Sequence, residues 1–336
     1  MKVLITGGAG YIGSTVASAM DDTGYTPVIL DSLVTGKREF VKNRIFYEGD
    51  IGDRQILEKI FSEHPDISCT IHCAALIVVP ESVTQPYNYY RENVCKSLEL
   101  FKTLIDLNHP RIIFSSSAAI YAPAPGFQVN EDSPLSANCP YAMTKIIMEN
   151  VLKDFCNAYP LKCISLRYFN PIGADPELRT GPHNRHPSHL LGLLVETAAG
   201  RREVFQLTGV NWPTRDGSGI RDYIHVWDLA AAHIAALQKF DEAIAGDKSV
   251  TKNYTVINLG TEKGVTVKEF FRAFEKVAGK KINMVETDPR PGDVAGGYAS
   301  CEKAFKLLGW KVTRSIEEGI TDALAWDKKR VEILGY

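Results

Sequence analysis

The opening stretch of the chain constrains the fold more than any other segment. Apolar residues at positions 3–5 run into a turn with glycines at 7, 8, 10 and 13, and an apolar-periodic segment begins at Ile12. The pattern predicts a strand, a glycine-rich turn and a helix. Glycine lets a ligand approach the backbone closely, and a helix start offers free N–H groups and the positive end of its dipole. We therefore expect the pyrophosphate of a dinucleotide to lie against this turn.

A second short apolar run, 27–30, ends in Asp31. An acid that binds the ribose of a dinucleotide is expected at about this distance from the glycine-rich turn. A carboxylate accepts hydrogen bonds from a ribose 2′-hydroxyl but repels a 2′-phosphate, which favours NAD over NADP. The competing interpretation is a tight turn that merely ends a buried strand. Asp50, after a third apolar run, is open to two interpretations: a bond to an adenine amino group, or a helix cap.

Short apolar runs alternate with amphipathic segments in the first half of the chain. We expect strands at 2–6, 26–31, 44–47, 68–73, 111–116 and 163–168, and helices at 11–23, 53–63, 87–108 and 141–159. This βαβ rhythm predicts an α/β fold with a doubly wound parallel sheet, the Rossmann fold.

Beyond residue 170 the chain changes to loops and short β-like runs, before a helix at 227–240 and a strand at 253–259 return. The rest, 264–336, has the pattern of a helix, a strand, a loop and two helices. We therefore expect a dinucleotide-binding domain of 1–170, completed by about 222–260, and a smaller C-terminal substrate-binding subdomain of 171–221 and 261–336.

The charge balance argues against several classes of partner. The 336 residues have a formal net charge of −2 and a pI near 6.5, and the basic runs are no longer than Lys328-Lys329-Arg330. Neither nucleic acid nor an anionic membrane surface is an expected partner. No apolar stretch approaches the length of a membrane span, and a strand begins directly after Met1, which leaves no room for a signal peptide. We expect a cytoplasmic protein.

Neither the cysteines nor the histidines predict a metal site. Seven cysteines are scattered along the chain without a C-x-x-C pair, a pattern typical of buried thiols in a reducing compartment. Cys69 and Cys73 flank an apolar strand and are interpreted as core residues. His183, His186 and His189 lie close together, but no acid or thiol accompanies them in sequence. We expect no metal.

Tyr141 and Lys145 are the first candidates for catalysis. They stand four residues apart at the start of a predicted helix, and hence on one face of it. A tyrosine needs a lowered pKa to act as a base near neutral pH, at a cost of about 4 kcal/mol, and both a lysine and a nicotinamide cation favour the phenolate. One such pair is expected by chance. Its position after an apolar strand that ends in Ser115-Ser116-Ser117 makes it significant.

Ser117 is open to two interpretations. Its hydroxyl lies at the sheet edge that also carries the glycine-rich turn, so it could bond a substrate hydroxyl or the ketone formed from it. A serine at a strand end is also a common cap.

With these residues in place, the sequence resembles the extended short-chain dehydrogenase/reductase family and, within it, the UDP-glucose (UDP-galactose) 4-epimerases. The motifs that carry the resemblance run in family order along nearly the whole chain: 6–13, Leu30-Asp31, 48–51, 81–83, 114–117, Tyr141 with Lys145, 167–171, 219–226 and 290–293.

The resemblance implies a reaction. Tyr141 removes the proton of the sugar 4-hydroxyl, Lys145 bonds the nicotinamide ribose and lowers the tyrosine pKa, and Ser117 assists. Hydride passes from C4 to NAD, the 4-ketose rotates, and hydride returns to its other face, so that NAD is regenerated each cycle. Arg221 and Arg290 would clamp the diphosphate, since each guanidinium can meet two phosphate oxygens.

The resemblance also implies two sets of contacts. It places the cofactor against Gly7, Gly10, Tyr11, Ile12, Gly13, Asp31, Ser32, Asp50, Ile51, Cys73, Ala74, Ala75, Asn93, Tyr141, Lys145 and Tyr168. It places the UDP-sugar against Ser117, Tyr141, Phe169, Asn170, His189, Leu190, Gln206, Thr208, Arg221, Arg290, Asp293 and Gly297.

Several positions depart from the family pattern. Ile77 stands where a lysine is frequent, Ala122 replaces a glycine, Thr208 stands where an aromatic residue often stacks on uracil, and His189 replaces a frequent asparagine. Gly297 is the most informative, because a tyrosine there goes with hexose-only activity and a small residue with acceptance of N-acetylhexosamines. We expect both UDP-Glc/UDP-Gal and UDP-GlcNAc/UDP-GalNAc to be substrates.

Other functions compete with this one. A nucleotide-sugar 4,6-dehydratase or decarboxylase would have acids after the strand-end hydroxyls, where this chain has Ala118-Ala119. Epimerisation of a UDP-pentose or UDP-uronate stays open. A non-catalytic NAD-binding scaffold would be free to lose Tyr141 or Lys145, and both are present. The family's homodimer, formed by helices around 87–108 and 141–158, is expected by analogy.

Overall fold

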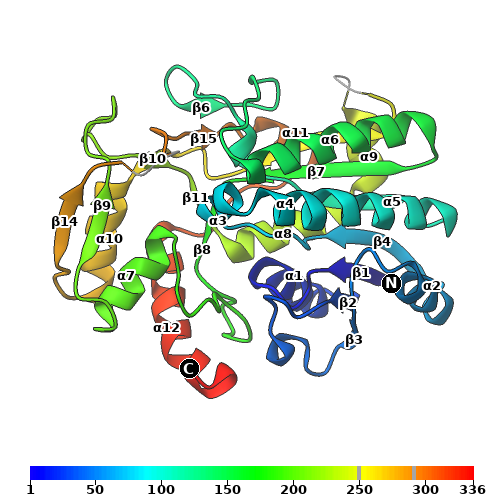
Figure 1. Ribbon diagram of the computed structural model, residues 1–336, viewed down its shortest axis with the longest axis horizontal. Helices are drawn as coiled ribbons and strands as arrows, with labels where there is room; N and C mark the ends of the chain where they lie inside the picture. Colours follow the sequence, from blue (N-terminus) through cyan, green and yellow to red (C-terminus); the bar gives the residue numbers. More distant parts are fainter. Residues whose placement is uncertain (248–250, 290–292) are drawn as a thin grey trace.

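The computed structural model describes residues 1–247, 251–289 and 293–336. A seven-stranded parallel sheet with the strand order β12-β7-β5-β4-β1-β2-β3 lies at its centre (Figure 1). The strands are β1 (Lys2–Thr6), β2 (Thr26–Asp31), β3 (Ile45–Glu48), β4 (Ile67–His72), β5 (Arg111–Ser115), β7 (Lys162–Tyr168) and β12 (Tyr254–Leu259). Each corresponds to one of the apolar runs noted above, and the predicted doubly wound α/β fold is confirmed.

Helices cover both faces of the sheet, which explains why its strands are apolar throughout. Successive side chains of β1 alternate between the two faces. Val3 and Ile5 pack with α1 (Tyr11–Asp22), α8 (Val226–Gln238) and α11 (Glu302–Leu308). Leu4 packs on the other face with α2 (Arg54–Glu63), α5 (Lys96–Asp106) and α6 (Pro140–Ala158).

The strand order reverses at β1, which has β2 on one side and β4 on the other. In doubly wound sheets such a reversal opens a crevice at the carboxyl ends of the strands, where ligands bind. The glycine-rich turn follows β1 at this edge, and residues 73–75 follow β4 beside it. The fold therefore brings the two segments to the expected binding crevice.

Short strand pairs form a second unit, most of which follows Tyr168. The chain returns to the main sheet with α8 and β12, and one strand of the second unit, β6 (Gln128–Val129), comes before Tyr168. β8 (Asn170–Ile172) pairs with β11 (Tyr223–His225), β9 (Phe205–Thr208) with β14 (Met284–Thr287), β10 (Ile220–Arg221) with β13 (Val265–Thr266), and β6 with β15 (Tyr298–Ala299). The helices α7 (Leu190–Ala198), α10 (Val267–Ala278) and α12 (Ile316–Leu334) pack with several of these strands in one apolar core that includes Phe270 and Phe274.

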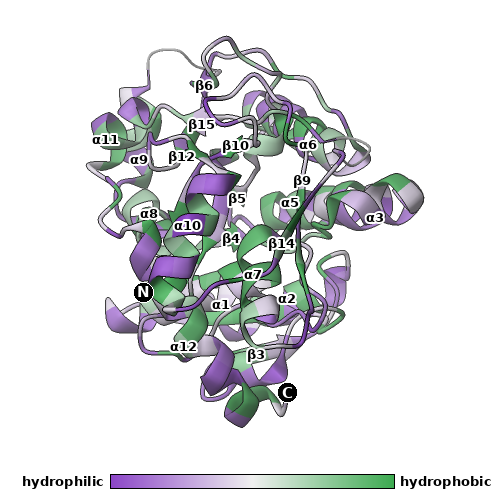
Figure 2. Cartoon of the chain, turned by 90° about the vertical axis from the view of Figure 1, so that its left-hand side faces the viewer, coloured by the Kyte–Doolittle hydropathy of each residue, from purple (hydrophilic) through white to green (hydrophobic). Residues whose placement is uncertain are grey.

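Helix α10 shows why this unit folds as it does. It begins at a capping box, in which Thr266 and Glu269 each accept a bond from the other's backbone N–H, and it ends at Gly279 with φ 66°. Its apolar side faces the core, and Figure 2, which looks onto this unit, shows hydrophilic residues along the outward side.

The predicted helix 87–108 is wrong as a single α-helix. The segment contains α4 (Pro86–Tyr90), a π-helical turn over Arg91–Cys95 and then α5, with α3 (Val79–Thr84) before them. The predicted helix 227–240 corresponds to α8, and a further short helix, α9 (Phe240–Gly246), follows it. In the part of the chain that the structure describes, no helix is both long and apolar enough to cross a membrane.

Candidate active site

The glycine-rich turn leaves no room for side chains on its inner side. Gly7 has φ +73°, and a Cβ there would lie 2.6 Å from the backbone nitrogen of Ala74. A Cβ at Gly13 would collide with the carbonyl oxygen of Gly7. Among the described residues no side chain caps α1 at its N-cap, Gly10. The turn thus combines a close-packed backbone with uncapped helix N–H groups, as an anionic ligand requires.

Asp31, at the end of β2, is built into the loop that follows it. One carboxylate oxygen accepts the Ala9 N–H at 2.9 Å, and the other accepts the Leu33 N–H at 2.8 Å. Burial raises the pKa of Asp31, and the two backbone bonds oppose that effect. A carboxylate can accept about four hydrogen bonds. Two acceptor sites on the carboxylate are therefore left for ribose hydroxyls. The neighbouring Ser32 is exposed.

Asp50 is not a helix cap. Its carboxylate accepts the Gly52 N–H at 2.8 Å and pairs with Lys96. The cap of α2 is Asp53, which accepts the Gln55 N–H at 2.9 Å. The capping interpretation of Asp50 is thus wrong, because the helix begins a few residues later than that interpretation requires. The adjacent Ile51 is buried.

Ser117, Tyr141 and Lys145 come together at the carboxyl edge of the sheet. Tyr141 is 8% exposed, and burial raises its pKa while its hydrogen bond with Ser117 lowers it. The Ser117 hydroxyl also accepts the Ala119 N–H at 3.2 Å. Ser117 therefore caps a short turn, as one of the two interpretations expected, and it also contacts the phenol.

Lys145 lies beneath the tyrosine, one helical turn along α6. It is 5% exposed, and its Nζ donates to the Ser115 carbonyl at 2.8 Å. The Nζ lies 4.9 Å from the centre of the Phe114 ring and 5.9 Å from that of Tyr141. Burial lowers the pKa of Lys145 to about 8. An ammonium held this close to a phenol favours ionisation of the phenol.

Asn93 joins the segment after β4 to helix α6. Its side-chain amide exchanges bonds with the backbone of Leu76, accepting the N–H at 2.8 Å and donating to the carbonyl at 2.9 Å. It also donates to the Thr144 hydroxyl at 3.2 Å. The π-helical turn contains Asn93, and such turns frequently occur at functional sites.

The other predicted cofactor residues lie between the glycine-rich turn and Lys145. The Cys73 N–H donates to the Thr6 carbonyl at 2.9 Å, and the Ser115 hydroxyl donates to the Cys73 thiol at 3.2 Å. Ala74 and Ala75 follow directly. Tyr168 ends β7 nearby, where burial raises its pKa well above the ordinary value.

A buried ion pair next to the cluster of Ser117, Tyr141 and Lys145 was not predicted from the sequence. Arg167 and Glu149 are 2% and 1% exposed, and they form two bonds, Nε to Oε1 at 2.9 Å and Nη2 to Oε2 at 2.6 Å. The Ser116 hydroxyl donates to the same carboxylate at 2.6 Å. Glu149 stands four residues after Lys145, so the spacing that joins Tyr141 to Lys145 continues to it.

Of the two arginines predicted to clamp the diphosphate, the structure describes Arg221. The Arg221 guanidinium donates to the carbonyls of Ile220 at 2.7 Å and Ala295 at 3.0 Å, and so supports the turn before Gly297. Arg290 lies outside the described residues. Asp293 is partly buried at the edge of the described chain.

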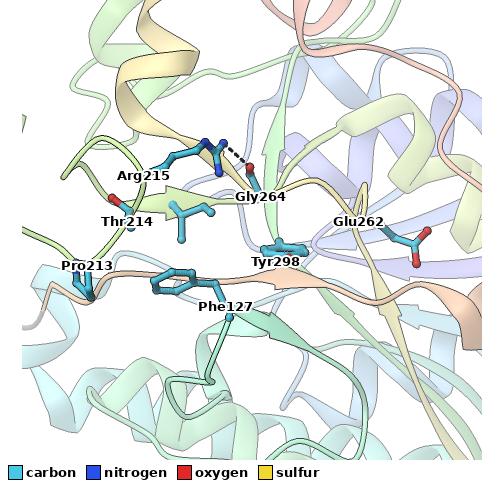
Figure 3. A pocket seen from close by; sticks show the side chains of 9 residues that line it. Phe127, Pro213, Thr214, Arg215, Glu262, Gly264 and Tyr298 are labelled. Atoms are coloured by element: carbon cyan, nitrogen blue, oxygen red, sulfur yellow. Dashed lines mark hydrogen bonds between the residues drawn. The ribbon is translucent and has the colours of Figure 1, made fainter.

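Gly297 lies close to the 122–127 loop. A Cβ at Gly297 would meet the Phe127 carbonyl at 3.0 Å. The next residue, Tyr298, lines a cavity of about 270 Å³ together with Phe127 and Arg215. The Arg215 guanidinium donates to the Gly264 carbonyl (Figure 3).

The other predicted substrate residues lie on separate elements. Asn170 begins β8, directly after Phe169, whose ring stacks on Tyr121 with centroids 6.5 Å apart. Gln206 and Thr208 lie in β9. His189 caps α7, accepting the Gly192 N–H at 3.2 Å, and Leu190 begins that helix.

The three neighbouring histidines have different surroundings. The His183 ring is bonded to the Thr35 carbonyl, His186 is exposed, and His189 caps α7. Within the described ranges, no group of three or more histidine, cysteine, aspartate or glutamate side chains is placed to hold a metal ion.

Comparisons with known proteins agree with this geometry. A model of the NAD dependent epimerase/dehydratase family matches residues 3–260. UDP-glucose 4-epimerase from Bacillus subtilis is 38% identical, covering 100% of this chain and 99% of that protein, and UDP-glucose 4-epimerase 2 from Arabidopsis thaliana is 39% identical, covering 97% and 94%.

Solved structures give the same result. UDP-glucose 4-epimerase from Stenotrophomonas maltophila, with bound NAD and formylated UDP-arabinopyranose, has a TM-score of 0.93 at 34% identity and covers 99% of each chain. The UDP-Glc/GlcNAc 4-epimerase from Campylobacter jejuni has a TM-score of 0.82 at 33% identity, covering 98% of this chain and 99% of that one. This chain belongs to the NAD-dependent epimerase/dehydratase family.

Proposed function

We propose that this protein interconverts UDP-glucose and UDP-galactose by reversible oxidation at C4 of the sugar, with a bound NAD that is regenerated in each cycle. The observation that carries the proposal is the cluster of Ser117, Tyr141 and Lys145 beside the glycine-rich turn. The relatives named UDP-glucose 4-epimerase, and the similar structures that hold NAD, support it.

The residues around the crevice fit NAD. The inner side of the turn at Gly7 and Gly13 has no space for a Cβ, and Asp31 keeps acceptor sites for ribose hydroxyls. We propose that Asn93 and Tyr168 complete the cofactor site with the residues after β4. When bound there, NAD supplies the hydride acceptor and donor that the reaction needs.

The chain's own residues move the proton. Tyr141 takes the proton from the 4-hydroxyl as C4 is oxidised and returns it when C4 is reduced. Lys145 remains close to the phenol and favours its ionised form, while Ser117 bonds the sugar oxygen. The 4-keto sugar must rotate to present its other face before reduction. The protein therefore has to hold the UDP part firmly and the sugar part loosely.

We propose that the second unit, 171–221 with 261–336, binds the UDP part. Asn170, Gln206 and Arg221 would contact the nucleotide, and Arg221 would do so beside the 294–296 turn that it already supports. Asp293, with Arg290, would lie at the diphosphate. Thr208 would contact the uracil, His189 at the start of α7 would contact the sugar, and Leu190 beside it would also contact the substrate.

The absence of a side chain at Gly297 extends the proposal to N-acetylated sugars. A glycine leaves space for an acetamido group at C2 of the sugar, and the similar enzyme from Campylobacter jejuni is described as acting on both sugar types. Gly297→Tyr should therefore abolish conversion of UDP-GalNAc and leave conversion of UDP-galactose. Equal loss of both activities, or no change in either, would contradict this specificity role.

We further propose a homodimer in the cytoplasm. Tyr87, which is 72% exposed, and Met143, which is 38% exposed, lie on α4 and α6 among the helices that would form the contact. Burial of such side chains between two copies would stabilise a dimer. Sedimentation of the purified protein tests this directly.

Purified protein should convert UDP-galactose, and then UDP-GalNAc and UDP-arabinopyranose, without added NAD. Tyr141→Phe should lower turnover by roughly 10² to 10⁴ while NAD stays bound. The control is Tyr159→Phe, which makes the same change at a phenol that is 39% exposed and should leave turnover unchanged. Near-normal turnover of Tyr141→Phe would remove Tyr141 from the mechanism.

A further inference from the structure

The segment 173–185 is fixed along helix α1. The Tyr11 hydroxyl donates to the Gly173 carbonyl at 2.7 Å. Farther along, the Arg179 guanidinium donates to both carboxylate oxygens of Asp22, at 2.7 and 2.9 Å. Tyr11 is the first residue of α1, directly after the glycine-rich turn. The segment therefore starts its path beside the expected pyrophosphate site.

Near its end this segment contacts the loop that follows Asp31. The His183 Nε2 lies 3.0 Å from the Thr35 carbonyl oxygen. A carbonyl can only accept, so this nitrogen carries the proton. Burial, and then the charge of Lys37, lowers the pKa of His183, while backbone bonds to Thr35 and Gly181 oppose that effect. The N–H at Nε2 is donated to the Thr35 carbonyl.

Residues 31–37, which we call the cofactor loop, are otherwise anchored at their two ends, to the end of β2 and to the glycine-rich turn. Asp31 accepts two backbone bonds at one end, and at the other end the Lys37 N–H donates to the Ala9 carbonyl at 2.9 Å. Between these two anchors Val34 is 79% exposed. The bond from His183 reaches the middle of the loop from the opposite unit.

Tyr336 braces this contact from outside. Its hydroxyl donates to the His183 carbonyl at 2.6 Å. Its ring centre lies 4.1 Å from the Arg185 guanidinium and 5.7 Å from the Lys37 ammonium. A cation of the 173–185 segment and a cation of the cofactor loop thus both lie near one aromatic ring, as does Arg330 at 5.9 Å, and such contacts attract each of them.

We propose that His183 and Tyr336 hold the cofactor loop closed over the adenosine half of the bound dinucleotide and so determine how long NAD stays. The inference rests on the proposed function, in which one NAD serves many cycles. Asp31 is placed to hold the adenosine ribose, so the nucleotide leaves only when the loop moves. Opening the loop breaks the bond to Thr35 and separates Lys37 from the Tyr336 ring.

The test is the rate of NAD release from the holoenzyme. Protein with its NAD is mixed with excess ¹⁴C-labelled NAD, and exchange is followed on rapid desalting. His183→Ala and Tyr336→Phe should each release NAD about three- to tenfold faster, as loss of one hydrogen bond implies. His183→Gln keeps an N–H donor and should restore slow release. His186→Ala, an exposed histidine three residues away, is the matched control and should leave the rate unchanged.

The outcomes separate the two proposals. Tyr336→Phe removes a single oxygen atom and His183→Gln is conservative, so melting curves of these variants show whether the fold is intact. Release at the wild-type rate from both His183→Ala and Tyr336→Phe would overturn the inference, as would equally fast release from His183→Gln and His183→Ala. Wild-type protein that carries no NAD and does not convert UDP-galactose would instead overturn the proposed function.

Discussion

The buried pair of Glu149 and Arg167 supports the active site, and replacing Glu149 with Gln tests that support. The change keeps the shape of the side chain but removes its charge, and places an NH₂ group among the donors of Arg167 and Ser116. Because both members of the pair are at most 2% exposed, the guanidinium loses the carboxylate to which it is directly bonded in the interior. Breaking a buried pair from one side costs about 3–5 kcal/mol.

This cost can be converted into a melting temperature. At about 2.1 cal/mol/K per residue, a chain of 336 residues has an unfolding entropy of about 0.7 kcal/mol/K. Glu149→Gln should therefore lower Tm by about 4–7 °C, followed by circular dichroism at pH 7. Glu149→Met with Arg167→Met removes both charges and should recover most of the loss.

A matched control is Glu58→Gln, which removes a carboxylate from an exposed pair with Arg54. Exposed pairs contribute little, so Tm should stay within about 1 °C of the wild-type value. The reasoning is refuted if Glu149→Gln melts as the wild type does, or if the double variant is as unstable as Glu149→Gln alone.

Two further predictions concern the cofactor site. Gly7→Ala should lower the NAD content of the purified protein at least about tenfold, because its Cβ meets Ala74 at 2.6 Å. The control is Gly126→Ala, which has a similar φ of +72° but open space around it. This control should cost only about 1–2 kcal/mol of backbone strain and keep NAD. Lys145→Met should change how stability depends on pH: burial lowers the folded pKa of Lys145 to about 8, so above pH 8 the unfolded chain keeps a proton that the folded protein has released. The stability of the wild type relative to this variant should then rise by about 3 kcal/mol between pH 8 and 10.5 in urea unfolding, and a flat difference would contradict the assigned burial effect.

The main sheet could be predicted because its strands are short apolar runs, most of them buried on both faces, as 27–30 is in β2. The pairs β8–β11 and β9–β14 could not, because each joins very short segments that are distant in the chain and have no period of their own. The π-helical turn at Arg91–Cys95 was missed for another reason: one widened turn hardly disturbs the apolar pattern of the helix around it.

The cluster proposed to be catalytic was predictable because Tyr141 and Lys145 share a helix face and follow a strand that ends in hydroxyls. Two signals could also have revealed the ion pair: Glu149 continues the same four-residue spacing, and Arg167 is a charge inside an apolar strand, which requires a partner. The bonds from Arg221 to backbone carbonyls could not be predicted, since they depend on how a distant turn folds against β10.

The carboxylate of Asp31 has a consequence for redesign of the protein. Its two oxygens hold the N–H groups of Ala9 and Leu33, so the acid proposed to bind the cofactor ribose also joins the glycine-rich turn to the loop after β2. Replacing it to admit a 2′-phosphate would remove both bonds at once and leave the Lys37 N–H bond to the Ala9 carbonyl between these segments. A change of cofactor preference would therefore have to be accompanied by new bonds for Ala9 and Leu33, and a single substitution at Asp31 would yield a weaker NAD site before it yielded an NADP site.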